Sequence, residues 1–92
     1  MQKEHRDIIR KNWVRLSEET PFPQILTHLF QEKIINKATV EDILWEKPTH
    51  RNWAFLDCLQ RSGPEAFHAF IRALKNCHRQ DLVDLLENGT SI

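Results

Sequence analysis

Histidine and cysteine are the side chains of this sequence that could bind a metal ion or act as nucleophiles. Five histidines and two cysteines are scattered along the 92 residues, and among them only Cys77 and His78 are adjacent. Small zinc sites usually place two ligands a few positions apart, as in C-x₂-C, and no such pair occurs here. Four ligands would have to converge from separate segments. We therefore expect no metal site and no cofactor.

Catalysis by this chain is not supported by the spacing of its reactive side chains. A catalytic thiol needs a histidine positioned against it, and neither Cys58 nor Cys77 stands in a recognisable nucleophile signature. The carboxylates show no evident pair that could share a cleft. Two glycines are too few for a glycine-rich phosphate loop. The chain is expected not to be an enzyme in itself.

The charges balance, but they are separated along the chain. Lys and Arg number 13, as do Asp and Glu, so the net charge is zero, which argues against a general nucleic-acid binder. Basic residues dominate the first 15 positions, whereas every charge after Arg79 is acidic. A neutral molecule with separated poles can dock head to tail. With no apolar run near the roughly 18 residues of a membrane span, no signal-peptide pattern and two cysteines expected to be reduced, we expect a cytoplasmic protein that does not enter membranes.

The apolar residues recur at helical spacing, which predicts an all-α fold of six short helices in one domain. The first helix should run from about residue 2 to 19, with a bend at Asn12, because Asn is weak in a helix interior. Pro21 and Pro23 should end it. Thr39 is the expected N-cap of the third helix, and Trp45 at its end is expected to be partly buried. The other side chains predicted to face the core are Ile8, Ile9, Leu16, Ile25, Leu26, Leu29, Phe30, Val40, Ile43, Leu44, Phe55, Leu56, Leu59, Leu82, Leu85 and Leu86.

The stretch RSGPEAFHAFIRAL, residues 61–74, carries the strongest local pattern. Gly63 permits a turn, and Pro64 is suited to the first position of a new helix. Phe67, Phe70 and the apolar residues that follow recur at i, i+3, i+4 and i+7, with alanines between them. This pattern predicts a central helix that is buried on most sides.

Four segments in order, HRDIIRKNWVRL, LTHLFQEKIIN, VEDIL and RSGPEAFHAFIRAL…LVDLLE, resemble the caspase recruitment domain at the front of initiator caspases. The likeness is greatest to the caspases that an apoptosome scaffold activates, including the insect type called Dronc. The R-x-G-P-x-A-F-x-x-F stretch, from Arg61 to Phe70, is the most specific part of the resemblance. It implies an antiparallel six-helix bundle with the Greek-key death-domain fold and a bent first helix. The domain would occupy residues 1–92, with its core at about 3–88.

The resemblance also implies a noncatalytic module that binds a homologous recruitment domain through oppositely charged surfaces. The basic surface would lie on the first and fourth helices and the acidic surface on the second and third. Carried onto this chain, the basic surface comprises Arg6, Arg10, Lys11, His50 and Arg51. The acidic surface comprises Glu32, Glu41, Asp42 and Glu46.

Trp13 and Trp53 depart from the family pattern, because relatives often have arginine at both positions. The departure favours an interface anchored by aromatic side chains and surrounded by charges, since Trp is enriched at such anchors. Both residues lie at the edge of a buried stripe. The sequence therefore leaves open whether each is an exposed anchor or part of the core.

The function expected from the sequence is recruitment of an initiator caspase to an adaptor or apoptosome scaffold. Copies of a domain with one basic and one acidic side can also associate head to tail into homo-oligomers. One alternative is a recruitment domain of an adaptor or inhibitor in apoptotic or innate-immune signalling. An alternative of a different class is a small helix-turn-helix nucleic-acid binder, favoured only by the basic start of the chain.

Overall fold

The computed structural model describes residues 2–90, apart from the side chains of residues 48, 49 and 88–90; residue 1 and residues 91–92 of the predicted domain lie outside the described part. Seven helices and no strand occur within the described residues. The helices are α1 (Lys3–Lys11), α2 (Trp13–Glu19), α3 (Phe22–Gln31), α4 (Lys37–Trp45), α5 (Pro48–Arg61), α6 (Ala66–Asn76) and α7 (Gln80–Thr90).

The bend predicted at Asn12 is confirmed, and it explains why there are seven helices and not the six expected. The backbone of Asn12 leaves the helical region, with φ −109° and ψ 20°. Its side-chain amide donates a hydrogen bond of 2.9 Å to the carbonyl of Ile8. This bond satisfies an end carbonyl of α1, so the predicted first helix is divided into α1 and α2.

Two predicted helix starts were wrong, the cap of α4 by three residues and the start of α6 by two. Asn36, not Thr39, caps α4: the Asn36 Oδ1 accepts a 2.8 Å hydrogen bond from the backbone N–H of Thr39. Asparagine is as good a cap as serine or aspartate. Helix α6 begins at Ala66 and not at Pro64, because Pro64 and Glu65 form a turn whose N–H···O bond joins Ala66 to Gly63.

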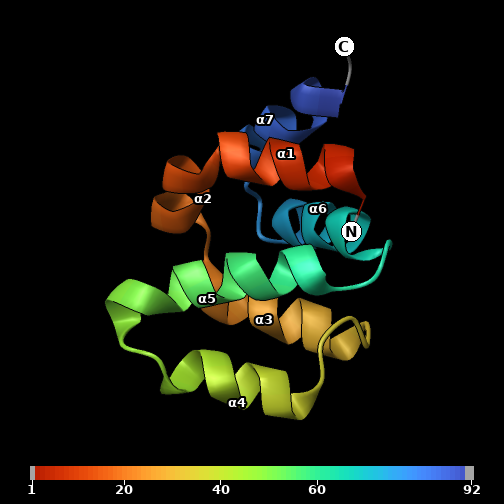
Figure 1. The fold of residues 1–92 in the computed structure, drawn as a ribbon. Helices are drawn as coiled ribbons and strands as arrows, with labels where there is room; N and C mark the ends of the chain where they lie inside the picture. Colours follow the sequence, from red (N-terminus) through yellow and green to blue (C-terminus); the bar gives the residue numbers. More distant parts are fainter. Residues whose placement is uncertain (1, 91–92) are drawn as a thin grey trace.

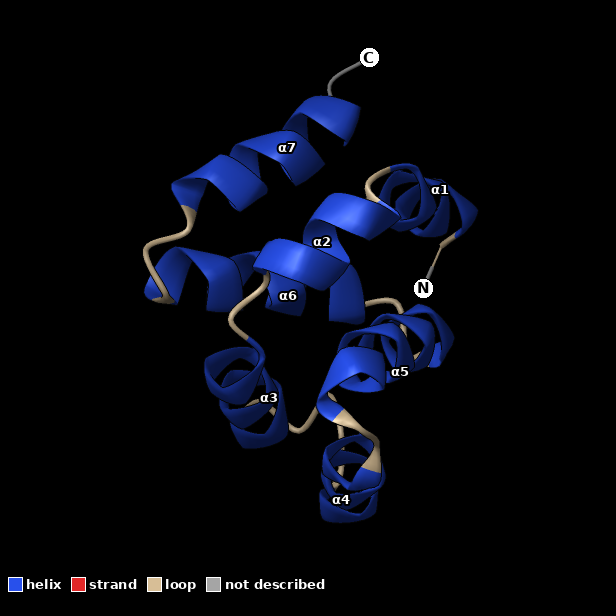
Figure 2. Cartoon of the chain, turned by 90° about the vertical axis from the view of Figure 1, so that its left-hand side faces the viewer, coloured by secondary structure: helices blue, strands red, loops and turns tan. Residues whose placement is uncertain are grey.

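Helix α6 is central in the bundle and packs against α3, α5 and α7. Helices α1 and α7 lie on one side of it, and α4 lies at the opposite edge of the molecule against α3 and α5 (Figure 1). Figure 2, the view from the side, shows the same order, with α4 at the foot of the molecule below α3 and α5. None of the helices in the described range is long and apolar enough to cross a bilayer.

The core prediction is confirmed at its centre. Phe67, Phe70 and Leu74 on α6 are at most 1% exposed. Phe55 of α5 meets Phe70 edge-on at 5.7 Å and Phe22 at 5.0 Å. Such tilted ring pairs add about 0.5–1.5 kcal/mol to the burial of their surface.

At the ends of α3 and α4 the core prediction was wrong. Phe30 and Leu44 were expected inside but are about half exposed, and Trp45, expected to be partly buried, is 91% exposed. Phe30 and Trp45 lie in the last turns of their helices, beyond the neighbours that cover the middle of each stripe. Phe22 and Val83 are core residues that the prediction omitted.

Arginine side chains join helix ends that are far apart in sequence. The Arg79 guanidinium donates a 2.6 Å hydrogen bond to the carbonyl of Glu19, at the end of α2, and pairs with Asp81 at the start of α7. These bonds raise the pKa of Arg79, with the Asp81 hydrogen bond as the main cause, and lower the pKa of Asp81. Arg79 thus fixes the position of α2, which carries one of the tryptophans, relative to α7.

Candidate protein-interaction site

The basic residues of α1 are exposed and free of carboxylate partners. Arg6, Arg10 and Lys11 all face solvent, and no carboxylate among the described residues lies within ion-pair distance of them. The Nε of Arg10 donates a 3.1 Å hydrogen bond to Oε1 of Gln60 on α5. The structure therefore brings Arg10 of α1 beside Gln60 of α5.

Trp13 and Trp53 contact one another, but their exposure differs. Their rings meet edge-on, with centroids 5.4 Å apart and planes at 80°. Trp13 is half-buried against the core, and its indole N–H is buried without a hydrogen-bond partner among the described residues. Trp53 is 60% exposed. Trp13 thus supports the packing of α2 on α5, whereas Trp53 presents an aromatic surface to solvent.

His50 and Arg51, the remaining predicted residues of the basic surface, have different roles in the structure. His50 is exposed in the first turn of α5. The Arg51 guanidinium turns toward α4 and donates 3.0 Å hydrogen bonds to the carbonyls of Leu44 and Glu46. Arg51 therefore caps the C-terminal end of α4, where cations are favoured, and only part of its donor capacity is free for a partner.

Glu32 and Glu41, two residues of the predicted acidic surface, already have partners within the chain. Glu32 accepts two hydrogen bonds from Arg72 of α6, the shorter 2.8 Å. Glu41 lies 3.9 Å from the ammonium of Lys37, one turn earlier on α4. Both pairs are exposed and individually weak, but they neutralise charge that a partner would otherwise meet.

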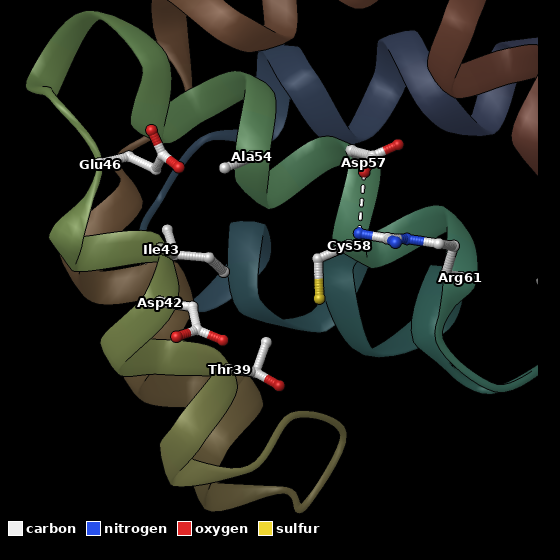
Figure 3. Close-up of a pocket in the computed structure, with 8 residues that line it drawn as sticks. All are labelled: Thr39, Asp42, Ile43, Glu46, Ala54, Asp57, Cys58 and Arg61. Atoms are coloured by element: carbon white, nitrogen blue, oxygen red, sulfur yellow. Dashed lines mark ion pairs between the residues drawn. The ribbon is translucent and has the colours of Figure 1, made fainter.

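Asp42 and Glu46, the other two predicted acidic residues, line a pocket of about 350 Å³ between α4 and α5. Figure 3 shows both on the α4 side of the pocket, with Glu46 near Ala54 and with Asp57 and Arg61 of α5 on the other side. Asp57 and Arg61 form a 2.8 Å ion pair, which leaves Asp42 and Glu46 as the carboxylates without an ion-pair partner in this pocket. The acidic surface is thus concentrated where α4 meets α5.

Asp57 and Arg61 are pocket residues that the sequence reasoning missed. The signal that could have found them is their i, i+4 spacing on the helix that also carries Trp53, with Asp57 one turn after Trp53. Cys58 lies at the same pocket. Burial raises the pKa of its thiol, so Cys58 is a poor nucleophile at neutral pH.

The two helices that carry the unpaired charges, α1 and α4, lie on opposite sides of α5, whereas Arg51 of the predicted basic surface reaches α4. Figure 1 shows α1 above α5 and α4 below it, and the turned view in Figure 2 agrees. The uncompensated cations of α1 and the uncompensated carboxylates of α4 are therefore carried by helices on opposite sides of α5. One molecule can bind two neighbours of complementary charge, one on each side.

No group of three His, Cys, Asp or Glu side chains in the described part of the chain is arranged to hold a metal ion.

The fold and these surfaces define an all-helical interaction module, and comparison with known proteins gives its family. Residues 6–89 match the model of the caspase recruitment domain. The chain belongs to this family, whose members are noncatalytic modules of the death-domain fold that bind other domains of the same kind. It is 32% identical over 87 residues to Caspase-2 from Gallus gallus, an alignment that covers 94% of the chain. The chain spans about a fifth of the length of that relative.

Proposed function

We propose that this domain recruits an initiator caspase to an adaptor or apoptosome scaffold in apoptosis, through contacts with a homologous recruitment domain. The observation that carries the proposal is the placement of uncompensated opposite charges on the two sides of α5. The basic surface consists of Arg6, Arg10, Lys11, His50 and Arg51, with Trp53 as its exposed aromatic anchor and Trp13 behind it. The acidic surface consists of Asp42 and Glu46, with the paired carboxylates of Glu32 and Glu41 as its further members.

The domain would act by raising the local concentration of the protease units linked to it, and no reaction would take place in the domain itself. Binding to a platform turns the meeting of two protease units into an effectively intramolecular event, with local concentrations on the order of millimolar for short linkers. The similarity to Caspase-2 supports a protease as the parent. Assignment to the apoptosome-recruited, Dronc-like type rests on the sequence motifs quoted above. The finer description of the fold as a six-helix Greek-key bundle rests on the same motifs. In that description α1 and α2 count as one bent helix.

Self-association and cytoplasmic localisation belong to the same proposal. Because the basic and acidic surfaces differ and are carried mainly by helices on opposite sides of α5, contacts between copies are heterologous and need not close. Light scattering on the isolated chain should therefore detect oligomers as concentration rises toward the millimolar range. A strictly monomeric chain would remove self-assembly from the proposal and leave recruitment by a partner.

Two alternative functions are distinguished by single measurements. A recruitment domain on an adaptor or inhibitor would have the same surfaces, and the sequence that follows residue 92 in the parent protein would identify it. A helix-turn-helix nucleic-acid binder should show salt-dependent binding to duplex DNA. The zero net charge opposes that function.

The deciding experiment is binding of the chain to a panel of purified recruitment domains from adaptor proteins, with charge reversal on each surface. Arg10→Glu should weaken binding through the basic surface, and Asp42→Lys binding through the acidic surface. Both effects should fade with salt, since charges are screened over about 10 Å at 0.1 M. Lys33→Glu, in the exposed loop after α3, is the matched control. If Arg10→Glu and Lys33→Glu bind equally well, α1 is not part of the interface.

A further inference from the structure

The first turns of α1 are attached to α6 by a histidine that lacks a hydrogen-bond partner. The imidazole of His5 stacks on the ring of Phe67, with centroids 4.1 Å apart and planes at 6°. His68, next to Phe67 on α6, meets the His5 ring edge-on at 5.4 Å. The Nδ1 atom of His5 is buried and has no hydrogen-bond partner among the described residues. A titratable ring thus occupies a position that suits an apolar ring.

Protonation of His5 conflicts with this position. A neutral imidazole carries one proton, and the buried Nδ1 without an acceptor favours the tautomer with the proton on Nε2. The second proton must therefore go to Nδ1. It converts an unpartnered acceptor into a charged donor with no acceptor within reach, which is the costlier of the two states. Attraction between the cation and the face of Phe67 offsets only part of that cost.

We propose that His5, Phe67 and His68 form a pH-sensitive latch, which holds the first turn of α1 on α6 at neutral pH and weakens as the pH falls. Within the described part of the chain, the groups whose charge acts on His5 are His68 on α6 and Glu4 on α1. No charged group of α7, which also packs on α1, is among them.

The direction of the pH effect follows from the environment of His5. Burial first, and the charge of His68 second, lower the pKa of His5, although Glu4 acts in the opposite direction. The unfolded chain, with a histidine pKa of about 6.5, then binds the proton before the folded chain does. The contribution of the latch is complete above about pH 6.5 and is lost as the pH falls through the lower pKa of the folded state.

The latch lies beside the basic surface of α1. Arg6 follows His5 directly, and Arg10, one turn later, has a separate attachment to Gln60 of α5. Opening the latch therefore displaces Arg6 while Arg10 stays anchored, and binding through α1 should weaken on acidification. This regulatory consequence rests on the proposed function, whereas the latch itself does not.

The test is an NMR pH titration of the 92-residue chain from about pH 8 to 5, without any partner. The His5 ring should titrate below about 6.5, and the Cα shifts of residues 4–7 should move toward coil values with the same midpoint. His5→Phe keeps a stacked ring but cannot titrate, so α1 should stay helical over the whole range. His28→Gln, on α3, is the matched control and should behave like the parent chain. The latch would be refuted if His5 titrated at or above about pH 6.5. It would also be refuted if the Cα shifts of residues 4–7 did not change as His5 titrates.

A second variant tests the role of His68. His68→Gln removes the second imidazole, whose charge lowers the pKa of His5, so the midpoint of His5 should rise. An unchanged midpoint contradicts the two-histidine latch.

Binding to a recruitment domain, measured at both pH extremes, tests regulation: the parent chain should lose affinity in acid and His5→Phe should not. If the parent chain and His5→Phe lose the same affinity in acid, only the regulatory role of the latch is refuted. If neither chain binds at either pH, the proposed function is refuted, and the NMR titration still tests the latch.

Discussion

Trp13 and Trp53 are preceded by the similar dipeptides Lys11-Asn12 and Arg51-Asn52, but the structure gives the two indoles different roles. Both preceding asparagines donate a side-chain hydrogen bond to a backbone carbonyl, Asn12 to Ile8 within α1 and Asn52 to Ser17 across the α2–α5 contact. These bonds fix the backbone just before each indole. The sequence showed that both tryptophans border a buried stripe. It could not show which one is covered, because that depends on how closely α2 approaches α5.

Trp53→Ala should impair binding and leave the fold nearly unchanged. Removing an exposed aromatic anchor typically costs at least about 2 kcal/mol of binding, or roughly a 30-fold loss of affinity. Stability should fall by no more than about 1 kcal/mol, the value of the lost ring pair. Affinity for a recruitment domain and the urea midpoint of the free chain are the two measurements. If Trp53→Ala changes neither the affinity nor the urea midpoint, Trp53 is not part of the interface.

Trp13→Ala should have the opposite result. Full burial would imply a loss of 3–5 kcal/mol, and because Trp13 is only half-buried we expect about 2 kcal/mol. Val14→Ala is a useful control, since Val14 is the next residue of α2 and is 68% exposed. Urea denaturation of both variants gives the comparison. Equal midpoints for Trp13→Ala and Val14→Ala would show that α2 is not held by its tryptophan.

At the scale of helices, α4 lies at the edge of the core. Only Ile43 of this helix is buried, and its last residue, Trp45, is almost fully exposed. What holds its C-terminal end is the Arg51 guanidinium on α5, bonded to two α4 carbonyls. The sequence predicted Arg51 as a residue of the binding surface but gave no sign of this bond, because the bond depends on the tertiary approach of α4 to α5.

Arg51→Ala should therefore loosen α4. Hydrogen bonds to a charged donor contribute about 1.5–3 kcal/mol each when buried, and for this partly exposed pair we expect a total loss of about 1–2 kcal/mol. Hydrogen exchange of the α4 amides should rise before that of α6. Arg61→Ala is the matched control on the same helix, because its exposed pair with Asp57 is worth about 0.5 kcal/mol or less. Similar exchange in the two variants would show that Arg51 does not hold α4.

At the scale of the whole molecule, the pattern of the sequence determined the helical class, the bend at Asn12 and the centrality of α6. Those features follow from local signals: proline positions, one weak helix residue and an i, i+3, i+4, i+7 repeat. The exposure of Phe30, Leu44 and Trp45 could not be predicted in the same way. A helical wheel says which side chains share a face, but it does not say where the neighbouring helix ends.

The last prediction concerns the centre of the core. Phe70 is fully buried and packs edge-on against Phe55, so Phe70→Ala should cost about 3–5 kcal/mol. Because a domain of this kind is stable by only about 5–15 kcal/mol in total, the variant should be partly or wholly unfolded at physiological temperature. Phe30→Ala, which removes the same side chain from a half-exposed site, should change stability by less than about 1 kcal/mol. Thermal melting followed by circular dichroism compares the two variants, and similar melting temperatures would contradict the central position of α6.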